Sequence, residues 1–201
     1  MELKLYEEIT GKLQKTLHYP RYVHSLGVAY TAAALAMKYE IDVDKALLAG
    51  LLHDCAKYFS DEDQIRLCRE GNVSLTQTET ENPKLIHAKL GTYIAVRDYG
   101  VGDAQILKAI ESHTTGQPDM TMLQKIIYLA DMLEPTRQKN IIPHLDEMRT
   151  LAFEDIDECI YKVTKNQLQF LESKGKGKVD PMTRETYYYY KDIYERKHGI
   201  R

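Results

Sequence analysis

The chain has 201 residues, of which 43% are hydrophobic and 28% charged, and its formal net charge is −3. This length and balance predict one globular domain, and the small negative charge argues against a nucleic-acid partner. The amino-terminal stretch lacks the apolar run of a signal peptide, and no apolar run approaches the roughly 20 residues that span a bilayer. Three cysteines without a CxxC pair fit a reducing compartment. We therefore expect a cytoplasmic protein without a membrane partner.

Apolar residues recur at steps of three and four almost everywhere, which predicts helices rather than strands. In chain order, the predicted helices cover residues 2–16, 20–39, 43–57, 61–70, 84–99, 103–113, 119–134, 142–149, 154–173 and 183–197. The polar segments 71–83 and 174–180 predict loops. The fold class is therefore all-α, a compact helical bundle. We expect a single domain over residues 1–201, with a core at about 20–141 and a helical extension at about 142–201.

Residues that favour helix ends agree with this division. Five residues are predicted to cap helix starts, namely Asp42, Ser60, Asp103, Asp119 and Asp180. Gly71, Gly100, Gly116 and Pro135 mark helix ends. The four consecutive tyrosines at 187–190 are expected to spread around a helix axis, packing in part and directing hydroxyls outward.

Six ionisable side chains share helix faces with apolar neighbours, and so are predicted to point inward: His24, His53, Asp54, His87, His113 and Asp131. One such histidine is usually a hydrogen-bonded core residue, and Asp131 alone could pair with Lys125 or Arg137. Six together are hard to explain structurally, because buried ionisable groups are costly unless compensated. Imidazole and carboxylate suit iron, manganese, cobalt, nickel or zinc. The set therefore predicts a metal site.

The remaining histidines, His18, His144 and His198, lie beside polar, turn or terminal residues and are expected on the surface. Three glycines, Gly27, Gly50 and Gly91, lie three or four residues from inward histidines. Glycine inside a helix costs ~1 kcal/mol relative to alanine. These glycines either allow close helix packing or leave room for an ion and a ligand.

Basic residues near the predicted cluster could meet an anionic substrate. Lys57 lies on the same side of its helix as His53 and Asp54, and it either neutralises a phosphate, pairs with Asp54 or faces solvent. Arg137 and Lys139 follow Asp131 in the loop "EPTRQKN". The planar guanidinium of arginine matches phosphate geometry, so phosphate binding is favoured for Arg137 over a solvated charge.

Other candidates for anion binding are weaker. Arg21, one turn before His24, is of the same kind as Arg137. Thr114, Thr115 and Gly116 follow His113 at a helix end, where hydroxyls and backbone donors meet an anion or simply terminate the helix. The run "KGKGK" at 174–178 is interpreted as a solvated loop rather than a screen for phosphate.

The pattern His24…His53–Asp54…Asp131 resembles the HD-domain metal-dependent phosphohydrolases. A more specific resemblance is to YqeK-type bacterial HD proteins, the symmetrical bis(5'-nucleosyl)-tetraphosphatases. The segments that carry it are "RYVHSLGVA" (21–29), "KALLAGLLHDCAK" (45–57), "LIHAKLG" (85–91), "ESHTTGQPDMTMLQKIIYLADMLEPTR" (111–137) and "NI" (140–141). They cover most of residues 20–141, and the carboxy-terminal third matches less distinctly.

The resemblance implies an all-α HD-type bundle that hydrolyses diadenosine tetraphosphate, and related dinucleoside polyphosphates, symmetrically to two nucleoside diphosphates. It also implies one or two ions of iron, or of another divalent transition metal such as manganese, cobalt or nickel. By this resemblance the metal ligands are His24, His53, Asp54 and Asp131, and His87 and His113 bind a second ion or the substrate phosphates. If two ions are present, Asp54 is the natural bridge.

These expectations define the candidate site. Asp54 and Lys57 are the candidate catalytic residues. The candidate substrate contacts are His24, His87, His113, Thr114, Asp131, Thr136, Arg137 and Ile141. The expected ligand is a dinucleoside polyphosphate or a nucleoside diphosphate, and a homodimer is left open. The alternatives are an HD-type nucleotidase or cyclic-nucleotide phosphodiesterase, or a non-catalytic nucleotide-sensing module.

Overall fold

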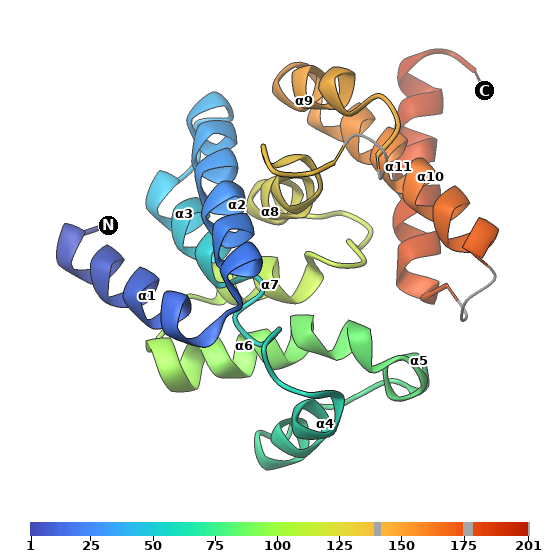
Figure 1. Cartoon of the computed structure of the whole chain (residues 1–201). Coiled ribbons are helices and arrows are strands. Elements are labelled where there is room, and N and C mark those ends of the chain that lie inside the picture. Colours follow the sequence, from blue (N-terminus) through green and yellow to red (C-terminus); the bar gives the residue numbers. More distant parts are fainter. Residues whose placement is uncertain (139–141, 175–178, 201) are drawn as a thin grey trace.

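The computed structural model describes residues 1–138, 142–174 and 179–200, and within these ranges it contains helices and no strands (Figure 1). The α-helices are α1 Leu3–Thr16, α2 Tyr19–Lys38, α3 Val43–Leu52, α4 Asp61–Glu70, α5 Gln77–Glu81, α6 Ile86–Tyr99, α7 Ala104–Ser112, α8 Met122–Leu133, α9 Leu145–Glu154, α10 Ile156–Lys174 and α11 Pro181–Lys197. A short 3₁₀ helix, η1 Pro83–Leu85, precedes α6. The predicted all-α class is confirmed. None of the described helices is both long and apolar enough to cross a membrane.

The helices α2, α3, α7 and α8 form the centre of the molecule. Helix α2 packs against α3 and α8, and α7 packs against α3, α6 and α8. The carboxy-terminal helices α9, α10 and α11 lie together on one side, in orange and red in Figure 1, and α10 packs on α8. Arg149 on α9 donates to the carbonyls of Leu133 and Glu134, each at 2.9 Å, and so stabilises the end of α8.

Most predicted helix starts are correct. Asp42, Ser60, Asp103 and Asp180 each accept a backbone N–H from the first turn of the following helix. The prediction for Asp119 is wrong, because Asp119 has a left-handed backbone with φ of 51° and α8 begins later. Thr121 caps α8 instead, in a reciprocal pair of hydrogen bonds with Gln124.

Three further predictions differ clearly from the structure. Helix α3 ends at Leu52 instead of continuing to residue 57, and the chain then makes tight turns in which Cys55 donates to Leu52 and Lys57 donates to Asp54. The polar segment 71–83 contains the short helix α5, which begins at a capping box between Thr76 and Glu79. Helix α9 covers Leu145–Glu154 rather than residues 142–149.

The tyrosine run is spread around α11 as predicted, with one exception in burial. Tyr190 is fully buried, and its hydroxyl accepts the backbone N–H of Met120 at 3.2 Å. Tyr187 and Tyr194 stack on Tyr161 of α10, whereas Tyr188 is exposed. These contacts fix α11 against α10 and against the start of α8.

At Gly50, helix α3 lies close against α2. A Cβ atom at residue 50 would lie 2.6 Å from the Cα of Ala29. At Gly27, a Cβ atom would lie 2.5 Å from a carboxylate oxygen of Glu134. At Gly27 and Gly50 the missing side chain therefore makes room for protein atoms, which is the close-packing interpretation, and not for an ion or a ligand.

Gly50→Ala is expected to lower the free energy of unfolding by roughly 1–3 kcal/mol, because the added methyl group overpacks two helix backbones. Gly11→Ala is the matched control. A Cβ atom there meets nothing within 4 Å, so the higher helix propensity of alanine should raise stability by roughly 0.5–1 kcal/mol. Urea unfolding with linear extrapolation measures both variants. Equal stability of the two variants would contradict the packing assigned to Gly50.

Candidate metal centre

Helix ends orient three of the buried histidines. His53 and His113 follow the last residues of α3 and α7, and each ring donates its Nδ1–H to the carbonyl three residues earlier, at 2.7 Å. Those carbonyls lie in the last turns of their helices, where backbone acceptors are available to side chains. His87 makes the same contact with the carbonyl of Lys84 in η1, also at 2.7 Å. Because Nδ1 carries the proton, each ring presents an unprotonated Nε2 to the centre.

His24 is oriented by a carboxylate instead. Its Nδ1 donates to Glu134 at 3.0 Å, and the fully buried Glu134 also accepts the N–H and the hydroxyl of Thr136, both at 2.6 Å. Its hydrogen bonds to His24 and Thr136 overcome the effect of burial and lower the pKa of Glu134. Sequence reasoning missed Glu134 as a site residue, and the only signal was its position three residues after Asp131.

The first donor set consists of His24 Nε2, His53 Nε2, Asp54 Oδ2 and Asp131 Oδ1. His24 lies 3.0 Å from Asp131, 3.3 Å from His53 and 3.9 Å from Asp54. His53 lies 3.5 Å from Asp54 and 3.7 Å from Asp131. Helices α2 and α8 and the end of α3 thus bring together four side chains that are up to 107 residues apart in sequence (131 − 24).

The second donor set consists of Asp54 Oδ1, His87 Nε2 and His113 Nε2. The two imidazole nitrogens lie 3.2 Å apart, and they lie 3.3 and 3.6 Å from the Asp54 oxygen. The hydroxyl of Thr114 lies 3.2 Å from both nitrogens. The two oxygens of Asp54 therefore face different sets of histidines, and this carboxylate connects them.

The donor chemistry and spacing suit a divalent metal ion. Nitrogen and oxygen ligands lie about 2.0–2.2 Å from such an ion, so neighbouring ligands are about 3–3.5 Å apart. Atoms of His24, His53 and Asp131, and of His53, Asp54 and His113, form compact groups of this kind, and all these side chains are buried. Imidazoles and carboxylates are ligand types that first-row transition metals accept.

Charges around the cluster keep its carboxylates ionised. Burial alone would raise the pKa of Asp54, but the surrounding imidazoles, His53 first, hold it well below its usual range. Asp131 behaves likewise, because its hydrogen bond with His24 and the charge of Arg137 outweigh burial and lower its pKa. The hydrogen bonds from His24 to Asp131 and Glu134 outweigh burial and raise the pKa of His24. Both carboxylates are thus available as anionic ligands.

Three cations surround the cluster on its open side. Arg21 donates to Asp54 at 2.7 Å, Arg137 donates to the carbonyl of Asp131 at 2.6 Å and to its carboxylate, and the amine of Lys57 lies 3.0 Å from His87. Arg137 is therefore not a solvated loop charge, and Lys57 lies against a histidine, with no ion pair to Asp54 among the described residues. Lys125, the other partner considered for Asp131, pairs with Asp157.

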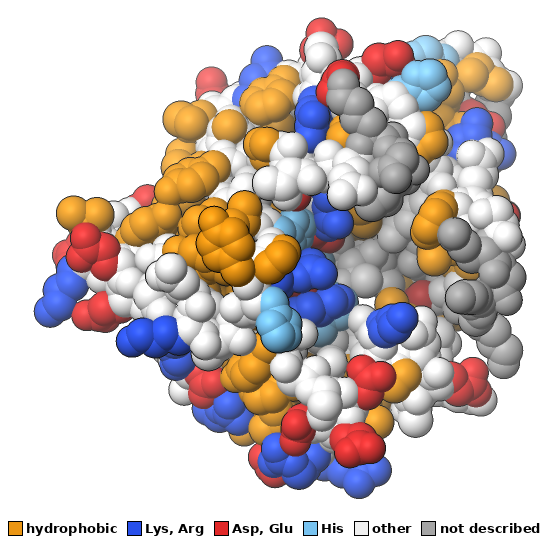
Figure 2. Space-filling model, in the orientation of Figure 1, with side chains coloured by type: hydrophobic (Ala, Val, Ile, Leu, Met, Phe, Trp, Pro, Cys, Tyr) orange, Lys and Arg blue, Asp and Glu red, His pale blue; other side chains and the backbone are white. Residues whose placement is uncertain are grey.

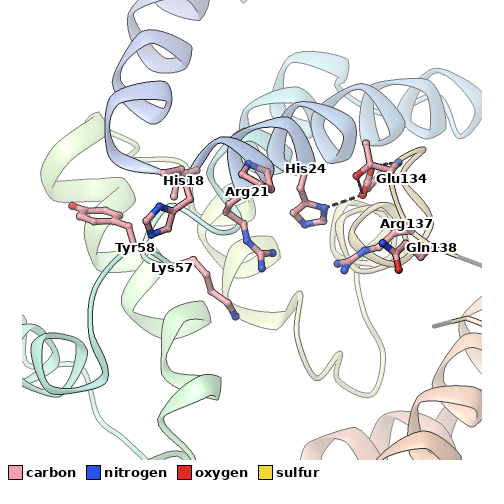
Figure 3. Close-up of a pocket in the computed structure, with 11 residues that line it drawn as sticks. His18, Arg21, His24, Lys57, Tyr58, Glu134, Arg137 and Gln138 are labelled. Atoms are coloured by element: carbon pink, nitrogen blue, oxygen red, sulfur yellow. Dashed lines mark hydrogen bonds and ion pairs between the residues drawn. The ribbon is translucent and has the colours of Figure 1, made fainter. Parts of the chain in front are cut away.

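The cations converge on a cavity of about 480 Å³ that reaches the cluster at His24 and Glu134. Figure 3 shows the ends of Arg21, Lys57 and Arg137 pointing into its middle from three different elements. On the face shown in Figure 2, side chains of Lys or Arg and of His gather in a central hollow. Thr136 also lines this cavity.

Two predicted candidates cannot be placed. Ile141 and Lys139 lie outside the described residues, and so does most of "KGKGK". His18, His144 and His198 are exposed as predicted, although His18 also lines the 480 Å³ cavity. The ligand and substrate roles assigned from the sequence stay predictions, whereas the proximity of the six side chains is a feature of the structure.

His87 should make the metal-free chain sensitive to acid. Burial lowers its pKa to about 3, with Asp54 opposing and Lys57 reinforcing the shift, whereas an unfolded histidine titrates near 6.5. Between these values only the unfolded state binds the proton, so stability falls as pH drops through this window. From pH 7.5 to 4.5, unfolding free energy should fall by roughly 2–3 kcal/mol more in the chelated wild type than in His87→Gln.

Urea unfolding of chelator-treated protein at the two pH values measures this difference. His144→Gln is the control, because the side chain of His144 is 69% exposed. This control should follow the wild type. Identical pH dependence of the wild type and His87→Gln would contradict the assignment.

Comparison with known proteins defines the class to which this fold and site belong. Residues 21–136 match the HD domain, which is more than half of the chain. The chain belongs to the HD-domain family. The matched region contains all six side chains of the two donor sets and ends just before Arg137.

More specific similarities extend over nearly the whole chain. The chain is 38% identical to the symmetrical bis(5'-nucleosyl)-tetraphosphatase of Bacillus subtilis, over 90% of this chain and 95% of the relative. It is 37% identical to the protein of that name from Staphylococcus aureus, over 77% and 78% of the two chains. A crystal structure from Clostridium acetobutylicum, described as a predicted HD superfamily hydrolase involved in NAD metabolism, has 39% identity and a TM-score of 0.88 over 94% of this chain and 97% of that one. The resemblance stated from the sequence is confirmed.

Proposed function

We propose that the chain is a metal-dependent symmetrical bis(5'-nucleosyl)-tetraphosphatase, which hydrolyses diadenosine tetraphosphate and related dinucleoside polyphosphates to two nucleoside diphosphates. The observation that carries the proposal is the position of Asp54. Its two oxygens belong to two buried donor sets, and three cations lie beside them at the wall of one cavity. The family and the similarity to tetraphosphatases over 90% of the chain support the same activity.

His24, His53, Asp54 and Asp131 would hold one ion, and Asp54, His87 and His113 a second. The family resemblance makes iron the first candidate, with manganese, cobalt or nickel as alternatives, and mixed imidazole and carboxylate donors suit all of these metals. Such an ion supplies positive charge, which acidifies water near it and offsets charge on phosphate oxygens. All three cysteines are free and buried, which agrees with a reducing, cytoplasmic location.

The protein's own residues bind and orient the polyphosphate. Arg137 and Arg21 offer guanidinium groups, which match the paired oxygens of a phosphate. Lys57 lies between the donor sets and the cavity, and its ammonium neutralises an oxygen of the central phosphates. Thr114 can donate its hydroxyl to a phosphate oxygen beside the second donor set. Holding the chain of phosphates in this way places its middle at Asp54.

In the reaction, the oxygen of a water molecule bonds to one of the two central phosphorus atoms. The bond from this phosphorus to the central bridging oxygen breaks, and the bridging oxygen leaves with the other half. Two nucleoside diphosphates are the products, and the two hydrogens of the water are left one on each new terminal phosphate, from which they are released as these phosphates ionise. The carboxylates of Asp54 and Asp131, which their surroundings keep ionised, would act as anionic ligands beside the attacking water.

Product identification tests the proposal. Diadenosine tetraphosphate incubated with the metal-loaded chain should give ADP as the sole nucleotide product. AMP together with ATP would show asymmetric cleavage and contradict the proposal. Hydrolysis of mononucleotides or cyclic nucleotides without turnover of the tetraphosphate would favour the nucleotidase or phosphodiesterase alternative. Nucleotide binding without any turnover would favour the sensing module.

A further inference from the structure

The cluster is reached by two cavities from different sides. The 480 Å³ cavity lies at the start of α2, beside the turn 53–58 and the loop after α8. A second cavity of about 290 Å³ is lined by His87 and Thr114, and by Gln167, Leu171 and Thr183 from α10 and α11. Lys57 lines both. Both volumes are close to the range of roughly 300–1,000 Å³ that is usual for small-molecule sites.

Symmetric cleavage requires a binding site on each side of the cluster, and the two cavities provide one each. The scissile bond is in the middle of the substrate, so an equal nucleoside diphosphate must extend from the cluster on each side. A single cavity beside the cluster would accommodate only one nucleoside. The arrangement of two cavities that meet at Lys57 matches a substrate with two nucleosides and a polyphosphate between them.

The outer part of the 480 Å³ cavity differs in chemistry from its inner part. The inner part carries Arg21, Lys57 and Arg137, and the other lining residues include Leu17, His18, Pro20 and Tyr58. In Figure 3 the rings of His18 and Tyr58 lie next to each other, beyond Lys57 as seen from Arg137. Tyr58 is half-buried and its ring packs on Phe59, with 4.0 Å between the centroids. Cations followed by a fixed aromatic surface are the surroundings that a phosphate followed by a base requires.

We propose that this cavity binds the nucleoside of one substrate half, and that the ring of Tyr58, flanked by His18, is the surface on which its base stacks. The inference rests on the proposed function and names the recognition elements for one end of the substrate. Stacking on an aromatic side chain tolerates any base, because every base has an aromatic face. Tyr58 should therefore raise the affinity for any substrate that carries a nucleoside at this end, without selecting a particular base.

The test compares a substrate with nucleosides and an inhibitor without them, on the full, metal-loaded chain. Tyr58→Ala should raise KM for diadenosine tetraphosphate by about tenfold to a hundredfold, as expected for loss of one stacked base. The inhibition constant of inorganic tetraphosphate, measured in the same assay, should stay within about twofold of the wild type, since this ion has no base to stack. Tyr58→Phe keeps the ring and should restore KM.

Tyr188→Ala is the matched control, because Tyr188 is 60% exposed on α11 and lines neither cavity. His18→Ala, at an exposed position, should raise KM in the same direction and is a second variant in case Tyr58→Ala folds poorly. An unchanged KM in both variants, or parallel changes in KM and in inhibition by tetraphosphate, would overturn the proposal. Absence of inhibition by tetraphosphate in the wild type would also count against it. Failure of the wild type to cleave the dinucleotide would instead refute the proposed function itself.

Discussion

Asp54→Asn is expected to lower kcat/KM for diadenosine tetraphosphate by about a thousandfold or more. Asp54 is the only described side chain with an oxygen in each donor set, so an amide in its place removes a negative charge from both. A metal ion contributes several kcal/mol of charge stabilisation to such reactions, and each ~1.36 kcal/mol corresponds to a factor of ten in rate. The variant should also retain less metal than the wild type.

Steady-state kinetics and elemental analysis of the same preparations measure the two effects. Asp63→Asn is the control, because the side chain of Asp63 is 47% exposed at the start of α4 and contacts only Ser60 and Arg66 in the hydrogen bonds described. This control should keep both activity and metal. Turnover of Asp54→Asn at the wild-type rate would show that the reaction does not need the carboxylate of Asp54, which would contradict the proposal.

Glu134→Ala should weaken metal binding or activity by about tenfold to a hundredfold, although Glu134 lies outside both donor sets. Partners that orient a ligating histidine typically have effects of this size. Without the carboxylate, the Nδ1–H of His24 loses its acceptor, and the ring is no longer held with Nε2 toward Asp131. Glu134→Gln keeps an acceptor oxygen and should fall between the wild type and the alanine variant.

Metal titration of chelated protein gives the affinities, and kinetics at saturating metal separates weak metal binding from misplacement of His24. Glu147→Ala is a matched control, since Glu147 also pairs with a histidine, His144, but on the surface of α9. If Glu134→Ala bound metal and substrate as tightly as Glu147→Ala, the orienting role of Glu134 would be wrong.

Much of the helical frame could be predicted from the sequence, because local signals decide it. Asp42, Ser60, Asp103 and Asp180 cap helices in the structure through contacts with residues two or three positions away. Such contacts depend only on neighbouring residues, so a sequence pattern can reveal them. The failure at Asp119 arose because Thr121, two residues later, forms the better reciprocal cap with Gln124.

The end of α3 could not be placed by periodicity. Apolar spacing continues past Leu52, but the helix ends there. The Nδ1–H of His53 donates to the carbonyl of Gly50, which a backbone N–H would otherwise occupy if the helix continued. Helix α5 was missed for a different reason, since its five residues are polar and only the capping box between Thr76 and Glu79 marks it. In both places hydrogen bonds of side chains decide the backbone, whereas apolar spacing does not.

The six buried histidines and aspartates were predictable because each continues an apolar helical pattern in the sequence, although His53, Asp54 and His113 lie just past the ends of α3 and α7. The contacts that these side chains make with Glu134 and Arg21 were not predictable. Glu134 meets His24 across 110 residues, and Arg21 meets Asp54 across 33. The local pattern gives only a weak signal for each residue, since Arg21 lies one turn before His24 and Glu134 lies three residues after Asp131. Contacts over such separations depend on how α2, α3 and α8 pack, which a single sequence does not specify.

Anomalous diffraction from crystals of the purified, active chain, recorded across the absorption edge of the metal found by elemental analysis, tests the central claim most directly. The account predicts a strong peak between the Nε2 atoms of His24 and His53 and the carboxylates of Asp54 and Asp131. A second ion would give a peak beside His87 and His113. Active protein with its metal bound elsewhere, or with no metal at these six side chains, would contradict the account.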